Sequence, residues 1–203
     1  MLTTRQMQRQ RPVSPDNGLP HNRRGLATLW ILLAVPGLVL MLVFVTDIAN
    51  IWLARVEATN ALEASALAAV KHWKDGGNSP ANRRAARRAA VRYAAANTVL
   101  GNAVNINRNN SATGDVNNNR SPSGNVVLGE ICFVAGQAIF KANQSPTDSE
   151  RFGVRTQATV PVSSLWNGFG GFSFGPYSVS VEAVALCRGS GQPRLVRIDQ
   201  FQP

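Results

Sequence analysis

Residue types that build catalytic and metal centres are scarce in this sequence. Its 203 residues include two histidines and two cysteines, which argues against a tetrahedral zinc cage or a disulfide-rich scaffold. Acidic residues number 11 against 21 lysines and arginines, which gives a formal net charge of +10. No His-Glu-x-x-His or phosphate-loop motif occurs, and both are signatures of known chemistries. The sequence therefore predicts no enzyme activity, no cofactor and no small-molecule substrate.

A long uncharged segment is the most informative feature that is present. Residues 26–46 contain no charged side chain and as a helix would span about 31 Å, the thickness of a bilayer's hydrocarbon core. Five arginines precede this segment, whereas Asp47 opens the other flank. Because basic residues stay in the cytoplasm, we expect a single pass with the N-terminus inside. The alternative, a cleaved signal peptide, usually has a shorter core of about 7–15 residues.

Shifts in composition predict how the chain is organised. Apolar residues recur at helical spacing as far as Gly76-Gly77, which is a C-terminal stop signal. Ser79-Pro80 then supplies a capping hydroxyl and a first-turn proline for a second helix that ends near residue 100. The expected regions are a cytoplasmic disordered basic tail (1–25), a transmembrane helix (26–46), an extracytoplasmic helical region (47–100), an Asn-rich loop (101–125), an antiparallel strand region (126–190) and a C-terminal tail (191–203).

Three segments have the pattern of strands. Residues 126–134 form an apolar run, and residues 152–162 and 177–187 alternate with period two, as expected for a sheet with one buried face. The predicted fold class is α+β. A long N-terminal helix, transmembrane and then extracytoplasmic, would pack on a small antiparallel sheet in a pilin-like arrangement.

Several residues are candidates for sites of bonding or interaction. Cys132 and Cys187 lie in the extracytoplasmic part, where a disulfide is allowed; two buried thiols are the alternative. Small residues that would allow close helix packing in the anchor are Ala27, Ala34 and Gly37. His72 is expected on the helix surface.

Two further groups could bind a surface or a partner. The second helix carries five arginines at i, i+4 spacings, which we interpret as one basic face that either attracts anions or is simply solvated: Arg83, Arg84, Arg87, Arg88 and Arg92. A glycine-rich loop carries four aromatic residues that could enter a membrane interface or dock on a partner, or else cover the edge of the sheet: Trp166, Phe169, Phe172 and Phe174.

The N-terminal half resembles a known family. Arg23-Arg24-Gly25, the apolar run, Asp47 and the alanine-rich stretch 58–69 are similar to the N-terminal region of TadE/TadG-like proteins of the tight-adherence (Flp) pilus assembly system. Residues 153–156 and 181–185 resemble strand motifs of the same family. Related pilins are cleaved after a glycine that is followed five residues later by Glu. The corresponding leader-peptidase site here is Gly25-Leu26, with Trp30 at the position of the acid.

The resemblance implies a function by association. It suggests a minor pseudopilin-like assembly component of a Tad/Flp-type pilus or secretion system, held in the bacterial inner membrane. Its expected partners are membrane lipid, other pilin-like or pilus assembly proteins, and further copies of the chain in a homo-oligomer, but not nucleic acid. The alternative is a membrane-anchored envelope-binding module that uses the arginine-rich helix on anionic lipid or polymer.

Overall fold

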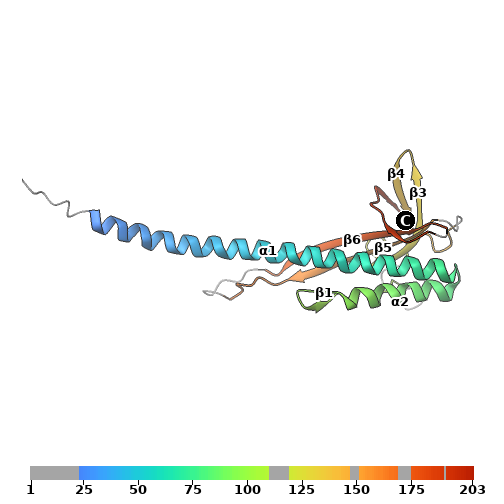
Figure 1. The fold of residues 1–203 in the computed structure, drawn as a ribbon, viewed down its shortest axis with the longest axis horizontal. Coiled ribbons are helices and arrows are strands. Elements are labelled where there is room, and N and C mark those ends of the chain that lie inside the picture. Colours follow the sequence, from blue (N-terminus) through green and yellow to red (C-terminus); the bar gives the residue numbers. More distant parts are fainter. Residues whose placement is uncertain (1–22, 110–118, 147–150, 169–174, 190) are drawn as a thin grey trace, which may run out of the picture. The chain divides into compact units, whose positions relative to one another are not determined.

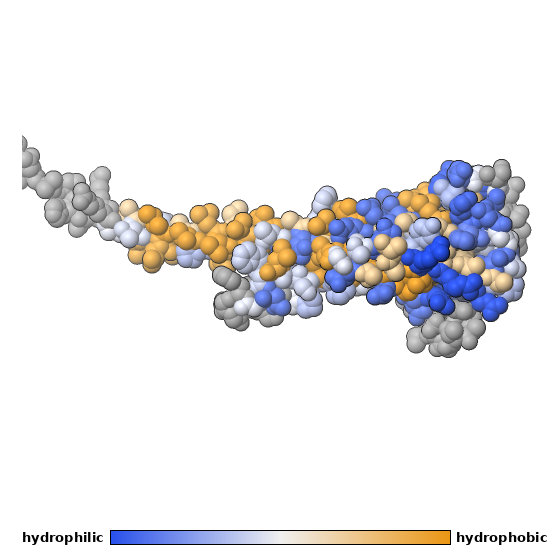
Figure 2. Space-filling model, turned by 60° about the horizontal axis from the view of Figure 1, so that its bottom comes forward, coloured by the Kyte–Doolittle hydropathy of each residue, from blue (hydrophilic) through white to orange (hydrophobic). Residues whose placement is uncertain are grey.

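The computed structural model describes residues 23–109, 119–146, 151–168, 175–189 and 191–203 (Figure 1). The chain divides into two compact units, Met1–Leu42 and Val43–Pro203. The described part of the first unit is the N-terminal part of α1, a continuous helix over Arg23–Gly76 that includes Pro36. Nearly all its residues up to Leu42 are exposed, and the visible face is strongly hydrophobic (Figure 2). Among the described residues, one helix, α1, is long and apolar enough to cross a membrane.

The second unit begins with the amphipathic part of α1. Its buried positions follow helical spacing and are mostly small, which allows close packing: Ala54, Ala58, Ala61, Ala66 and Ala69. Helix α2, Pro80–Ala96, starts as expected, because the Ser79 hydroxyl accepts a hydrogen bond from the Asn82 amide at 3.2 Å. It ends earlier than predicted. A hairpin of β1 (Thr98–Val99) and β2 (Asn102–Ala103) follows, with Leu100 and Gly101 at positive φ in its turn.

A six-stranded sheet forms the rest of the unit, in the order β7-β6-β5-β3-β4-β8. The predicted strands are confirmed as β3 (Val126–Val134), β5 (Phe152–Val162) and β6 (Tyr177–Cys187). Strand β4 (Gln137–Lys141) was not predicted. The expected C-terminal tail also contributes β7 (Arg194–Leu195) and β8 (Gln200–Gln202). Strand β8 pairs parallel with β4, whereas all other neighbours in the sheet are antiparallel.

The sheet is covered on both faces. Helices α1 and α2 cover one face, where Trp73 packs edge-on against Phe152 with ring centroids 4.8 Å apart. Figure 1 shows α1 alongside both α2 and the strands β5 and β6. The other face has its own core, in which Phe140 stacks on Phe201 at 5.7 Å. The α+β class and the long N-terminal helix are therefore confirmed.

Helix–helix and helix–sheet packing is fixed by buried hydroxyl groups. The Ser65 hydroxyl donates to the Ala90 carbonyl at 2.8 Å and joins α1 to α2. The Thr156 hydroxyl donates to the Leu62 carbonyl at 2.9 Å and joins β5 to α1. Because a buried polar group without a partner is costly, these two bonds set the register of α1 against both neighbours.

Candidate interaction surfaces

An exposed apolar row continues along α1 beyond the uncharged segment. It consists of Ile48, Trp52 and Val56 at i, i+4 spacing, with Leu53 beside them; we call it the apolar ridge. Ile48 and Trp52 are 65% and 69% exposed. The ridge faces away from Ala54 and Ala58, which are buried against the domain. Contiguous exposed apolar residues that include a tryptophan are typical of an interaction site.

A second feature ties α1 to the loop after β5, and we call it the polar clasp. Asp47 is only 5% exposed. Its carboxylate accepts hydrogen bonds from the Ser164 hydroxyl at 2.5 Å and from the Leu165 amide at 3.1 Å. The Trp166 indole N–H donates to the Thr46 hydroxyl at 2.7 Å. These donors satisfy a carboxylate that would otherwise be costly to bury. The resemblance to TadE/TadG-like proteins had singled out Asp47, but nothing in the sequence indicated its partners.

The predicted basic face needs a correction, because two of its five arginines do not point outward. Arg87 is only 3% exposed. Its guanidinium donates to the carbonyls of Arg108 at 2.8 Å and Val126 at 2.5 Å, and to the Asn119 side chain at 2.6 Å. Arg83 donates to the Gln144 carbonyl at 3.2 Å. Successive helix residues are rotated by about 100°, so the row 83/87 faces the domain when the row 84/88/92 faces solvent.

Burial also changes the acidity of Arg87. Its pKa is lowered to about 10, first by loss of hydration and then by repulsion from Arg83. The three hydrogen-bond acceptors of the guanidinium in the described structure are neutral oxygens. Arg87 therefore acts as a buried cross-link between α2 and the loop and strand beside it, and it does not belong to the surface for anions.

The remaining basic row lies on the surface. Arg84, Arg88 and Arg92 are exposed, and strongly hydrophilic residues gather over the α2 side of the molecule in Figure 2. Arg88 and Arg92 line a groove of about 380 Å³ with His72 of α1, which is exposed as expected. Among the described residues, none of these three arginines forms an ion pair. The basic surface thus consists of three arginines instead of the five predicted, and His72 lies beside two of them.

The disulfide prediction is not met, because Cys132 and Cys187 are both free thiols. Cys132 lies on β3 and Cys187 on β6, with β5 between them. Two ladder steps separate these strands by about 10 Å, whereas a disulfide needs Cα atoms within about 7 Å. Burial raises the pKa of the Cys187 thiol, which donates to the Gly191 carbonyl at 3.3 Å. The alternative of buried thiols holds for Cys187, whereas Cys132 is half-buried.

The aromatic loop is only partly described. Trp166 belongs to the polar clasp, while Phe169, Phe172 and Phe174 lie outside the described residues. Residues 171–175 also have the Gly-x-Ser-x-Gly spacing of a hydrolase elbow. That motif requires a turn from a strand into a helix, whereas this segment precedes β6 in a connection between antiparallel strands. Of these five residues, the structure describes only Gly175.

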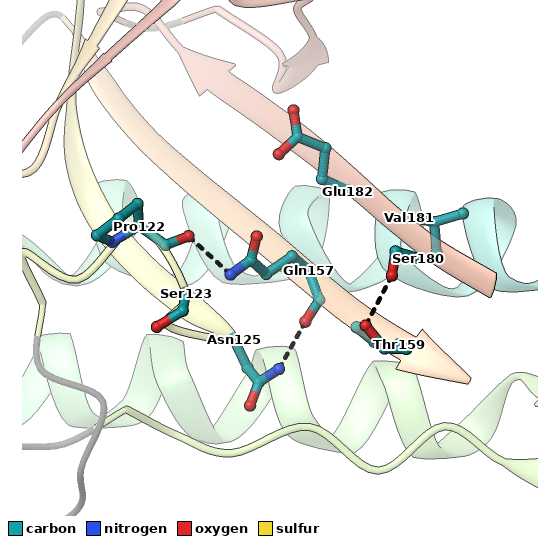
Figure 3. Close-up of a pocket in the computed structure, with 9 residues that line it drawn as sticks. Pro122, Ser123, Asn125, Gln157, Thr159, Ser180, Val181 and Glu182 are labelled. Atoms are coloured by element: carbon teal, nitrogen blue, oxygen red, sulfur yellow. Dashed lines mark hydrogen bonds between the residues drawn. The ribbon is translucent and has the colours of Figure 1, made fainter. Parts of the chain in front are cut away.

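A polar groove of about 660 Å³ lies over β5 and β6 beside the turn at Pro122 (Figure 3). Its polar side chains are engaged with one another or with backbone: Gln157 donates to the Pro122 carbonyl at 2.8 Å, and the Thr159 and Ser180 hydroxyls are 2.8 Å apart. Glu182 forms an ion pair with Arg155 at 2.6 Å. Within the described residues, no group of three or more His, Cys, Asp or Glu could hold a metal ion.

The small residues of the anchor and the predicted leader-peptidase site are all exposed in the single chain. Ala27, Ala34 and Gly37 lie on α1, and a Cβ added to Gly37 would meet no atom within 4 Å. Gly25 and Leu26 lie in the first turns of the same helix and are also exposed. These positions are therefore accessible on the surface of α1.

Together these features describe an α+β protein with one candidate membrane-spanning helix and with exposed apolar and basic surfaces. Residues 25–97 match the family described as "Putative Flp pilus-assembly TadE/G-like", which confirms the resemblance over that stretch. The match covers α1 from Gly25 and all of α2, and it leaves the strand motifs of β5 and β6 outside. Searches of curated proteins and of solved structures gave no match.

Proposed function

We propose that the protein is a minor pseudopilin-like assembly component of a Tad/Flp-type pilus or secretion system. The observation that carries this proposal is the apolar ridge, which is exposed and lies on the helix matched by the pilus-assembly family. A structural protein of this kind works by association and needs no catalytic group. Its partners would be pilin-like or pilus assembly proteins and further copies of the chain, within membrane lipid.

The energetics of the ridge support association. Burying Ile48 and Trp52 against a partner helix would contribute about 2 kcal/mol each. Within the bilayer, where there is no hydrophobic drive between helices, close approach depends on small residues. Ala27, Ala34 and Gly37 offer such positions along the first part of α1. Each part of α1 thus offers its own surface to a partner, small residues in the first unit and the apolar ridge in the second.

The same proposal includes a location and a processing step. We place α1 in the bacterial inner membrane, with the arginines before it in the cytoplasm and residues 47–203 outside. Cleavage between Gly25 and Leu26 would leave α1 almost complete. Trp30 stands where related pilins carry an acid, so mass spectrometry of the mature chain is the direct test of this step.

Photo-crosslinking tests the ridge directly. A benzophenone amino acid at Trp52 of the full chain, expressed in its host, should give crosslinks to another pilus protein or to a second copy. The matched control is the same probe at His72, which is also exposed on α1 but lies about 30 Å further along it. Equal crosslinking at both positions, or none at Trp52, would contradict the proposal. Loss of surface pili with Trp52→Ala but not with His72→Ala would support it.

The basic row supports a second candidate function, binding to an anionic envelope polymer or lipid surface. Arg84, Arg88 and Arg92 lie about one helical turn apart on α2, which spaces them by roughly 6 Å. His72 of α1 lines the same groove as Arg88 and Arg92. The full chain in neutral nanodiscs should co-sediment with anionic vesicles at low salt and be released at high salt. Replacing these three arginines with glutamine should abolish binding. The control triple Arg55, Arg194 and Arg197, all exposed, removes equal charge elsewhere.

A further inference from the structure

The polar clasp lies where the uncharged segment ends. Thr46 is the last residue of that segment, and Trp166 hydrogen-bonds to its hydroxyl. Asn50, one turn further along α1, donates to the Ser163 carbonyl at 3.2 Å. The loop after β5 is therefore fixed beside the end of the uncharged segment, which is where hydrocarbon would give way to headgroups if residues 26–46 span the bilayer. This placement follows from hydrogen bonds within one unit of the molecule and does not depend on how the two units are arranged.

The groove beside the clasp is lined by uncharged residues, while the carboxylates of Asp47 and Glu57 are hydrogen-bonded to the backbone amides of Leu165 and Leu100. A groove joins Asn50, residues 99–105 and residues 158–165, and none of these residues is charged in a chain of net charge +10. Leu165 is 66% exposed, and Phe44, Val45 and Ile48 of α1 are exposed at the same level. An uncharged surface with exposed apolar side chains and a tryptophan is the composition found at membrane–water interfaces.

We propose that the loop of residues 163–168 is a second membrane contact, with Leu165 inserted among the lipid headgroups of the bilayer that holds α1. Tryptophan rings favour this depth, because one end is apolar and the indole N–H finds a polar partner. Asp47 would be costly next to hydrocarbon. The clasp removes that cost by giving the carboxylate two donors, so that α1 leaves the membrane at a fixed residue. This contact goes beyond pilus assembly and does not require it.

A depth measurement tests the contact on the full chain. A polarity-sensitive fluorophore is attached at Leu165→Cys in a background in which Cys132 and Cys187 are replaced by Ser and Ala, and the protein is reconstituted in vesicles. Nitroxide-labelled lipids should quench this probe strongly, and aqueous iodide only weakly. The control probe at Leu195→Cys, exposed on β7, should show the reverse. Equal behaviour of the two probes would overturn the proposal.

A clasp variant separates the loop from the anchor. Asp47→Ala removes both acceptors, so the probe at residue 165 should lose most of its lipid quenching while the protein stays in the vesicles. Ser164→Ala removes one donor and should give an intermediate loss. Circular dichroism identifies a variant that has failed to fold. If a folded Asp47→Ala variant keeps full lipid quenching, the clasp does not place the loop.

Discussion

Arg87 shows how a single residue can change role once its environment is known. In the sequence it is one of five arginines at helical spacing, and charge alone assigns it to the surface. In the structure, three neutral oxygens bind its buried guanidinium. Because its pKa is lowered to about 10, the unfolded chain holds the proton more tightly. The contribution of this group to stability therefore rises as the pH increases above about 10.

Replacing Arg87 tests its structural role. Arg87→Ala leaves the acceptors of Val126, Arg108 and Asn119 with fewer donors in a buried site, and we expect the free energy of unfolding to fall by about 2–3 kcal/mol. The matched control, Arg84→Ala, removes an exposed arginine from the same helix and should cost less than about 0.5 kcal/mol. Urea unfolding of the full chain in micelles measures both. Equal losses would show that Arg87 is not a cross-link.

The two cysteines should react very differently. Cys187 is 2% exposed, and burial raises its pKa, so its thiolate forms at higher pH than usual and is shielded when it does. Cys132 is partly accessible. Alkylation of the folded chain near pH 8 should therefore label Cys132 much faster than Cys187, and the difference should disappear in urea. Mass spectrometry measures the alkylation of each cysteine over time. If neither cysteine reacts until a reductant is added, the two form a disulfide.

At the scale of elements, two facing glycines shape the sheet. Gly129 of β3 lies opposite Gly153 of β5, and the ring of Phe140 fills the space that side chains would occupy. Phe140 lies on β4, so this packing holds β4 against the sheet. The same ring stacks on Phe201 of β8. Small residues on two strands thus allow a third and a fourth strand to close the second core.

A methyl group at Gly129 should disturb this arrangement. Its Cβ would clash with the Lys141 carbonyl oxygen and lie 2.7 Å from the Phe140 ring. We expect Gly129→Ala to lower the free energy of unfolding by about 1–3 kcal/mol. The control Gly37→Ala, with no atom within 4 Å of the added group, should leave the unfolding of the strand domain unchanged. Unfolding followed by far-ultraviolet circular dichroism compares the two variants.

The elements that sequence reasoning found are those with many repeats of their period. Helices α1 and α2 and the strands β5 and β6 each show their period over at least eleven residues, and β3 is a nine-residue apolar run. Strand β4 has five residues and β7 has two, too few for periodicity. Their pairing depends on the fit of Phe140 and on the chain end. The polar clasp could likewise not be predicted from the sequence, because it joins residues 117 positions apart.

At the scale of the whole molecule, the prediction concerns sidedness. If residues 47–203 lie outside the cytoplasm, a membrane-impermeant maleimide should label Leu195→Cys in intact spheroplasts. The same reagent should reach Ser14→Cys, in the arginine-rich tail, only after lysis. Both variants are made without Cys132 and Cys187. The opposite labelling pattern would reverse the proposed topology, and labelling of both sites before lysis would exclude a membrane-spanning α1.

The hydrogen bond from Thr156 to Leu62 spans 94 positions of the chain, and this separation sets an order of events during biosynthesis. The ribosome completes α1 long before it makes the strands that cover it. The underside of α1 must therefore wait, uncovered, through most of translation and export. Until residues 152–187 have been made, a nascent chain of this design exposes the alanine-rich surface of α1 that β5 and β6 later cover.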